Sequence, residues 1–197
     1  MSDDAAAIQR RTVLQMAVGL AASGALPGAL PGPLPAPRAR RDATPPKPTG
    51  KPGDFDFLAG EWTIENRQRK GDEWDEFDGE ATVHRLLDGL VSVEELRIPE
   101  RKFSGMGLRI LERSKRLWAD YWMNSRDGVL AAAPAWGSFV DGVGLWDGDD
   151  VEEGKPIIVR GAWDEITKRS CRWYQAVSRD DGKTWDQSWI MEWTRRK

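Results

Sequence analysis

The sequence of 197 residues contains one cysteine, Cys171, and one histidine, His84. A single cysteine excludes an intrachain disulfide, and no Cys-x-x-Cys pair can form. The chain also lacks a Gly-x-Ser-x-Gly nucleophile elbow and a phosphate-binding glycine loop. The sequence therefore demands no cofactor and no metal, and no catalytic constellation in it identifies a reaction.

Basic side chains form no stripe along the folded part of the chain. Residues 1–50 carry six basic and three acidic side chains, a balance of +3, whereas the whole chain has a net charge of −3. The remaining residues 51–197 therefore carry −6. Since nucleic-acid binding depends on neutralising phosphates, this acidic body argues against a nucleic-acid partner.

No apolar run is long enough for a confident membrane span, but the N-terminus has the features of an export signal. Arg10-Arg11-Thr12-Val13-Leu14 resembles the twin-arginine motif, and residues 13–26 follow as a mild apolar stretch. Small residues before a possible cleavage after Ala25 fit a signal peptidase. We expect residues 1–26 to direct the protein to the periplasm or the medium, with no stable membrane span after cleavage. An ordinary amphipathic N-terminus is the alternative.

Residues 27–53 hold nine of the twelve prolines and five interspersed basic residues. Such a composition is typical of a stiff, extended spacer rather than a packed element. The sequence therefore divides into a signal peptide at 1–26, a proline-rich linker at 27–53 and a folded domain at 54–197.

The folded domain alternates short two-faced segments with turn signals. Six Asp-Gly pairs occur in it, and Asp-Gly between alternating runs is a strong signal for a tight hairpin. The predicted strands are 62–69, 80–87, 91–98, 105–112, 117–124, 136–140, 143–147, 156–163, 170–178 and 187–195. About ten sequential strands of this kind favour an all-β, up-and-down antiparallel barrel, with a two-sheet sandwich as the alternative.

Residues 178–185, Ser-Arg-Asp-Asp-Gly-Lys-Thr-Trp, match the Asp-box pattern Ser-x-Asp-x-Gly-x-Thr-Trp. Sialidases and related propellers carry several copies, but this chain has one and is too short for a large propeller. We interpret the box as a folded turn in which Asp180 caps backbone amides and Trp185 tucks under the hairpin. A glycan-recognition role is the alternative.

Gly60-Glu61-Trp62 opens the first strand and resembles the Gly-x-Trp signature of the calycin superfamily, the lipocalin-like barrels. In that superfamily a basic residue from the last strand lies across the indole. The resemblance implies this role for Arg195 or Arg196 through a cation–π contact. The other short lipocalin motifs are not evident.

A closer resemblance is to a bacterial family with a calycin-like domain of unknown function. It rests on these segments of the sequence: 54–62 (Asp-Phe-Asp-Phe-Leu-Ala-Gly-Glu-Trp), Tyr121-Trp122, 139–144 (Phe-Val-Asp-Gly-Val-Gly), 172–178 (Arg-Trp-Tyr-Gln-Ala-Val-Ser) and Thr184-Trp185. The likeness covers about residues 53–195 and implies the fold, not a reaction.

Eleven tryptophans are the unusual feature of the composition. Because alternate residues of a barrel strand face inward, a polar residue that shares a face with aromatics can contact a ligand. We predict a cavity lined by Trp122, Trp173 and Trp189, in which Glu95, Asn124 and Gln175 orient a small hydrophobic or aromatic molecule. In the alternative interpretation these tryptophans fill the core.

Candidate acid or base groups are Glu95, which follows two valines on the same face, together with His84 and Tyr121. His84 has two further interpretations, a haem ligand or a surface residue.

The sequence thus leaves three functions open. The first is an exported barrel that binds a small apolar or aromatic molecule. The others are a cofactor-independent isomerase or hydrolase-type enzyme and a glycan-binding module.

Overall fold

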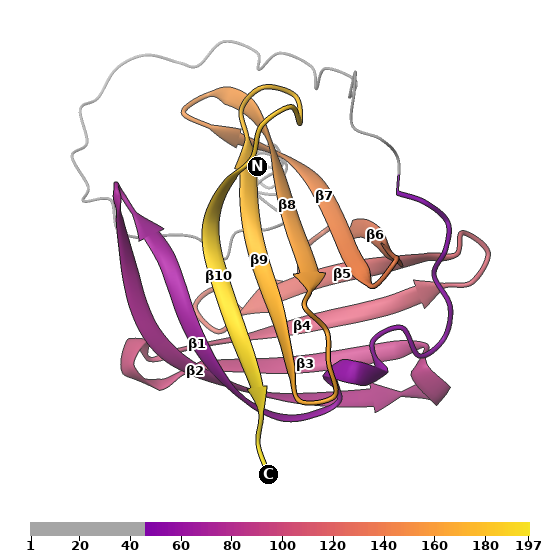
Figure 1. Ribbon diagram of the computed structural model, residues 1–197. Coiled ribbons are helices and arrows are strands. Elements are labelled where there is room, and N and C mark those ends of the chain that lie inside the picture. Colours follow the sequence, from indigo (N-terminus) through magenta and orange to yellow (C-terminus); the bar gives the residue numbers. More distant parts are fainter. Residues whose placement is uncertain (1–45) are drawn as a thin grey trace, which may run out of the picture.

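The computed structural model describes residues 46–197, which form one closed barrel of ten antiparallel strands (Figure 1). The expected signal peptide at 1–26 and the linker up to residue 45 lie outside the described residues. Each strand pairs with its neighbours in chain order, and β1 pairs with β10 to close the ring. The predicted all-β, up-and-down barrel is therefore confirmed, and the chain does not form the alternative sandwich.

The strands are β1 (Gly60–Lys70), β2 (Glu73–Leu86), β3 (Val91–Ile98), β4 (Phe103–Glu112), β5 (Leu117–Asn124), β6 (Ala135–Val140), β7 (Val143–Glu152), β8 (Lys155–Asp164), β9 (Ser170–Ser178) and β10 (Asp186–Arg195). Short 3-10 turns occur at η1 (Asp56–Leu58), η2 (Leu87–Gly89) and η3 (Pro99–Arg101). No helical segment in this part of the chain has the length and apolar character that a membrane crossing requires.

Strict alternation defines the strands, as β1 shows. Trp62, Ile64 and Asn66 are buried inside the barrel, whereas Glu61 and Thr63 are exposed. This period of two is what a strand with one face on a core requires. All ten predicted strands are present for this reason, although β2 begins earlier than expected, at Glu73.

Four of the six Asp-Gly pairs lie in connections between strands, and two do not. Asp141-Gly142 forms the β6–β7 turn with φ values of 51° and 82°, the left-handed conformation that such a turn needs. Asp78-Gly79 and Asp147-Gly148 lie inside β2 and β7, so their assignment to turns is wrong. At Gly79 a Cβ would lie 3.0 Å from Asn66 Nδ2, so this glycine makes room for a buried side chain.

The segment before β1 closes one end of the barrel. Phe55 is buried, and its ring centroid lies 4.9 Å from that of Trp118 and 5.0 Å from that of Phe139. Phe57, in η1, lies 5.9 Å from Trp163. The apolar residues that show no alternation in the sequence therefore form an aromatic plug, defined here as residues 54–58 (the indigo turn in Figure 1).

The first and last strands are joined to this plug by one side chain. Arg195 lies over the buried indole of Trp62, with its Cζ 4.2 Å from the ring centroid. Its guanidinium donates hydrogen bonds to the carbonyl oxygens of Phe57 and Ala59, and Trp62 Nε1 donates to Leu58 O at 2.7 Å. The contact implied by the resemblance is thus confirmed and belongs to Arg195.

The end of the proline-rich segment also contacts the barrel. Thr49 Oγ1 donates to Phe139 O at 2.7 Å, and Gly50 N donates to Arg116 O at 2.8 Å. Ser138 Oγ, on β6, donates in turn to Lys47 O. The chain therefore docks on the barrel several residues before the plug begins.

The clamp formed by Arg195 gives a first prediction. Arg195→Ala should lower the free energy of unfolding by about 3 kcal/mol, because it removes a cation–π contact and leaves the plug carbonyls without their donor. Urea denaturation followed by tryptophan fluorescence measures this loss.

Arg196→Ala is the matched control. Arg196 pairs with Glu80 on the surface, where one ion pair contributes less than about 1 kcal/mol. Equal losses in the two variants would contradict the role assigned to Arg195.

Candidate functional site

Three charged side chains from adjacent strands meet inside the barrel. Glu94 on β3 and Arg109 on β4 are buried, and Asp120 on β5 is half-buried beside them. Arg109 Nη2 donates to Glu94 Oε2 at 2.6 Å, and Arg109 Nε lies 3.7 Å from Asp120 Oδ1. A buried guanidinium without counter-charges would be costly, so the two carboxylates keep it ionised. We call these three residues the charged cluster.

Aromatic rings complete the surroundings of Arg109. Its Cζ lies 5.2 Å from the ring centroid of Phe55 and 5.3 Å from that of Trp163. Both distances are within the range of a cation–π attraction. The aromatic plug therefore packs directly against the charged cluster.

Burial raises the pKa of Asp120 from about 3.8 to about 6, against the opposing attraction of Arg109. Burial also disfavours the Arg109 cation, but Glu94 and Asp120 outweigh it, so the pKa of Arg109 lies above its ordinary value. Asp120 therefore changes charge near pH 6, whereas Arg109 stays positive.

A cavity of about 30 Å³ lies against the charged cluster. Its lining includes five tryptophans, Trp122, Trp146, Trp163, Trp173 and Trp193, and Tyr121 also contributes atoms to it. This volume is about the space of one water molecule. Buried tryptophans thus fill most of the core, and the remaining hollow is small.

Trp122 lies between this cavity and the surface, because it lines the cavity and is only half-buried. A Cβ on Gly105 would lie 2.2 Å from Trp122 Cζ2, so the indole packs directly on the backbone of β4. β5 pairs with β6 only through residues 118–120, and beyond them Trp122 O accepts a hydrogen bond from Ala131 N. The wall is therefore least supported at Trp122.

Several N–H donors at the cavity have no hydrogen-bond partner among the described residues. They are Arg109 Nε and Nη1 and the indole Nε1 atoms of Trp122, Trp163 and Trp193. Trp146 differs, because its Nε1 donates to Trp118 O at 3.3 Å. Buried polar groups are nearly always paired, so this concentration of unpaired donors marks the cavity as unusual.

Three of the predicted site residues, Tyr121, Trp122 and Trp173, line the cavity. Trp189 lies behind Trp173, with its ring centroid 6.0 Å away, and its Nε1 donates to Asn66 Oδ1 at 3.0 Å. Trp189 is therefore a satisfied core residue beside the site.

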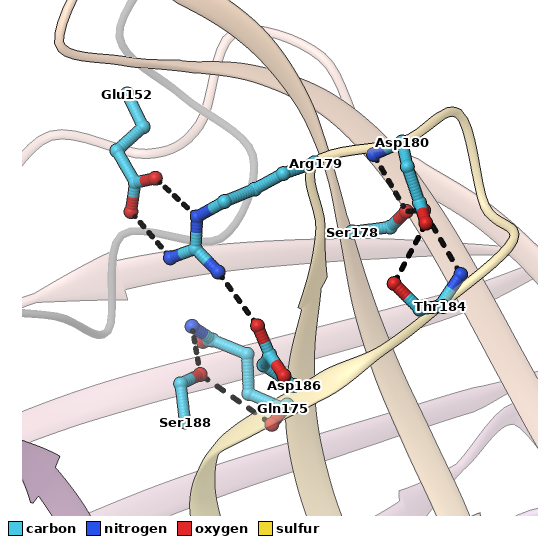
Figure 2. A network of polar contacts seen from close by, with 8 residues as sticks. All are labelled: Glu152, Gln175, Ser178, Arg179, Asp180, Thr184, Asp186 and Ser188. Atoms are coloured by element: carbon cyan, nitrogen blue, oxygen red, sulfur yellow. Dashed lines mark hydrogen bonds and ion pairs between the residues drawn. The ribbon is translucent and has the colours of Figure 1, made fainter. Parts of the chain in front are cut away.

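Two of the three predicted polar ligand contacts, Gln175 and Asn124, have other partners. Gln175 is buried, and its Nε2 donates to Ser188 Oγ at 3.1 Å (Figure 2). Asn124 Oδ1 accepts hydrogen bonds from the backbone N–H groups of Arg126 and Asp127, so it caps the turn after β5. The structure thus places neither side chain at the cavity.

Glu95 and His84 lie on the outside of the barrel. Glu95 is exposed and accepts a hydrogen bond from Arg97 Nη1 at 2.7 Å. The interpretation of Glu95 as an inward carboxylate is therefore wrong, because its neighbour Glu94 faces the interior. His84 is also exposed, which confirms the surface interpretation and contradicts an acid–base or haem-ligand role inside the barrel.

Sequence reasoning missed the charged cluster itself. Asp120 shares a strand face with Trp118 and Trp122, which is the signal that could have found it. The sequence pattern does not indicate Glu94 and Arg109, because both faces of β3 and of β4 carry apolar residues. Only the burial seen in the structure shows which face of each strand is interior.

The Asp box is a folded turn (Figure 2). Asp180 accepts hydrogen bonds from Thr184 N and Thr184 Oγ1, and these contacts lower the pKa of its carboxyl to about 2. Trp185 Nε1 donates to Gly182 O, and the Cζ of Arg160 lies 3.8 Å from the Trp185 ring centroid. The structural interpretation is confirmed. Arg160 covers one face of the Trp185 ring.

Other reactive groups form no second centre. Within residues 46–197, no three His, Cys, Asp or Glu side chains are arranged to hold a metal ion. Cys171 is buried, and burial raises the pKa of its thiol well above the usual range. A thiol in this environment behaves as a small hydrophobic side chain.

No family model and no curated protein matches this sequence. Two solved structures are similar over most of the chain. One is a protein of unknown function from the DUF3598 family of Nostoc punctiforme, with 14% identity over 72% of this chain and a TM-score of 0.45. The other is Rv2717c from M. tuberculosis, with 10% identity over 73% of this chain and a TM-score of 0.46.

The match spans 98% of Rv2717c but 49% of the Nostoc protein, so this chain covers about half the length of the latter. At these identities the likeness concerns the barrel alone and says nothing about a ligand or a reaction.

The pKa of Asp120 gives a second prediction. An unfolded chain loses this proton near pH 4, whereas the folded protein keeps it to about pH 6. The contribution of Asp120 to wild-type stability should therefore fall as the pH rises from 4 to 6, because the native state binds this proton more tightly. Relative to wild type, Asp120→Asn should gain about 3 kcal/mol between pH 4 and pH 7.

Urea denaturation at several pH values measures this difference. The ionisable groups that act on Asp120 are Arg109 and Glu94, and both are retained in the variant. Glu95→Gln, on the exposed face, is the control and should follow the wild type. Parallel curves for wild type and Asp120→Asn would refute a raised pKa.

Proposed function

We propose that this barrel binds a small, largely apolar or aromatic molecule at the cavity beside the charged cluster. The observation that carries the proposal is the wall of that cavity, where Trp122, Trp163 and Trp173 surround buried charges and unpaired donors. Small-molecule sites are usually concave and aromatic, with a few convergent polar groups. A purely structural core needs no such polar groups, since each one left unpaired is destabilising.

Binding requires the wall to move, because about 30 Å³ cannot hold an aromatic ring. Trp122 is the side chain whose rotation would enlarge the site, since it lies at the surface end and beyond the β5–β6 ladder. The adjoining loop, residues 125–134, exposes Val129 and Leu130, which offer an apolar approach to this point.

The site of action that we propose is the cell envelope or the medium. The support is the twin-arginine pattern at Arg10-Arg11 with its apolar stretch and proline-rich spacer. An exported carrier or receptor can sequester an apolar compound that has low solubility in water.

A cofactor-independent enzyme is a second candidate, and one observation favours it. Asp120 has a pKa of about 6 and lies at the cavity beside Arg109. A carboxyl group that titrates near the working pH is suited to donate or accept a proton on a bound molecule. This role would fall to Asp120 rather than to Glu95 or His84, which face away from the cavity.

The third prediction tests binding with N-phenyl-1-naphthylamine, a neutral apolar dye that fluoresces when shielded from water. Wild type should bind it. Gly161→Leu should weaken binding at least tenfold, because Gly161 lines the cavity and a larger side chain fills it. Trp122→Ala should strengthen binding, since it removes the wall that must move.

Trp74→Ala is the matched control, because Trp74 is an exposed indole at the β1–β2 hairpin and should not matter. Circular dichroism establishes that each variant is folded. Absence of binding by the wild type, or equal binding by wild type and folded Gly161→Leu, would overturn the proposal.

A further inference from the structure

The buried polar atoms of the cavity lining that have no hydrogen-bond partner among the described residues are all donors. Arg109 has one partner, Glu94, for Nη2, while its Nε and Nη1 have no hydrogen-bond partner. The indoles of Trp122, Trp163 and Trp193 bring three further unpaired N–H groups from β5, β8 and β10. Guanidinium and indole groups can only donate, so these five atoms can be satisfied only by an acceptor.

The charges at the cavity restrict what that acceptor can be. Arg109 is already opposed by two carboxylates, Glu94 and Asp120, from the neighbouring strands. An anionic ligand would add a third negative charge where little water screens it, and the repulsion would be strong. A hydrocarbon would also bind unfavourably, because it would leave the N–H donors buried without an acceptor.

We propose that the cavity takes the uncharged carbonyl oxygen of its ligand, as found in a ketone, quinone, ester or amide. This inference rests on the proposed function and specifies the chemical class of the molecule. The oxygen lies among the N–H groups of Arg109, Trp163 and Trp193, and the apolar remainder of the ligand extends toward Trp122. A carbonyl oxygen has two lone pairs, so it satisfies two of these donors directly.

The fourth prediction uses three probes of similar size, acetophenone, benzoate and ethylbenzene, which differ in the group attached to the ring. The ¹⁵N-labelled full-length chain is titrated with each at pH 7, and the indole N–H signals are followed by NMR. Acetophenone should bind at least tenfold more tightly than ethylbenzene or benzoate. The indole signals of Trp163 and Trp193 should shift with acetophenone as their protons become hydrogen-bonded.

Paired variants separate hydrogen bonding from packing. Trp163→Phe keeps a ring but removes one free donor, so the advantage of acetophenone over ethylbenzene should fall about fivefold. Trp146→Phe is the matched control, because Trp146 also lines the cavity but its N–H already donates to Trp118 O. The advantage of acetophenone should persist in that control.

Each result has a separate meaning. If none of the three probes binds, the proposed function fails and the inference fails with it. If ethylbenzene binds as tightly as acetophenone, or if benzoate binds most tightly, the barrel is a receptor but the carbonyl assignment is wrong. These wild-type comparisons decide the question even if a variant does not fold.

Discussion

Closure of the sheet between β1 and β10 is the constraint on which the other features of this molecule depend. A barrel of sequential hairpins has its two ends in the first and last strands, and here Arg195 of the last strand lies over Trp62 of the first. The same guanidinium holds the carbonyl oxygens of Phe57 and Ala59, which fixes the aromatic plug at one end. Phe55 of that plug packs on Arg109. The position of the interior site therefore depends on the closure between β1 and β10.

Burial of the charged cluster has an unfavourable desolvation free energy, which the pairing of its three charges offsets in part. Glu94, Arg109 and Asp120 come from three consecutive strands, so their proximity follows directly from the order of the sheet. Breaking such a cluster by removing one partner leaves an unpaired charge, whereas an apolar replacement of the whole is often tolerated. Retaining it together with unpaired donors is a cost that proteins usually bear at sites of function.

Access to the interior depends on how unevenly neighbouring strands are paired, and not on an open end of the barrel. β4 pairs with β5 through eight residues, whereas β5 pairs with β6 through three. Segments with fewer ladder hydrogen bonds open at lower free energy, so Trp122 and the loop at 125–134 are the part of the wall most able to move. The same barrel can therefore be well packed at rest and admit a small molecule at one point.

The amino-acid sequence by itself determined the ten strands and the Asp-box turn, because these depend on alternation and on short-range turn chemistry. For the packing partner of Trp62 the resemblance left Arg195 and Arg196 open, and the tertiary structure selected Arg195. The sequence also indicated Trp122 and Trp173, which share faces with other aromatics. Only the tertiary structure decided which face of β3 is interior. Val93 and Glu94 alternate, and both faces of that strand carry apolar residues, so periodicity cannot say which one is buried. Closure of the barrel settles it, and pairing with β4 places Glu94 on the same face as Arg109.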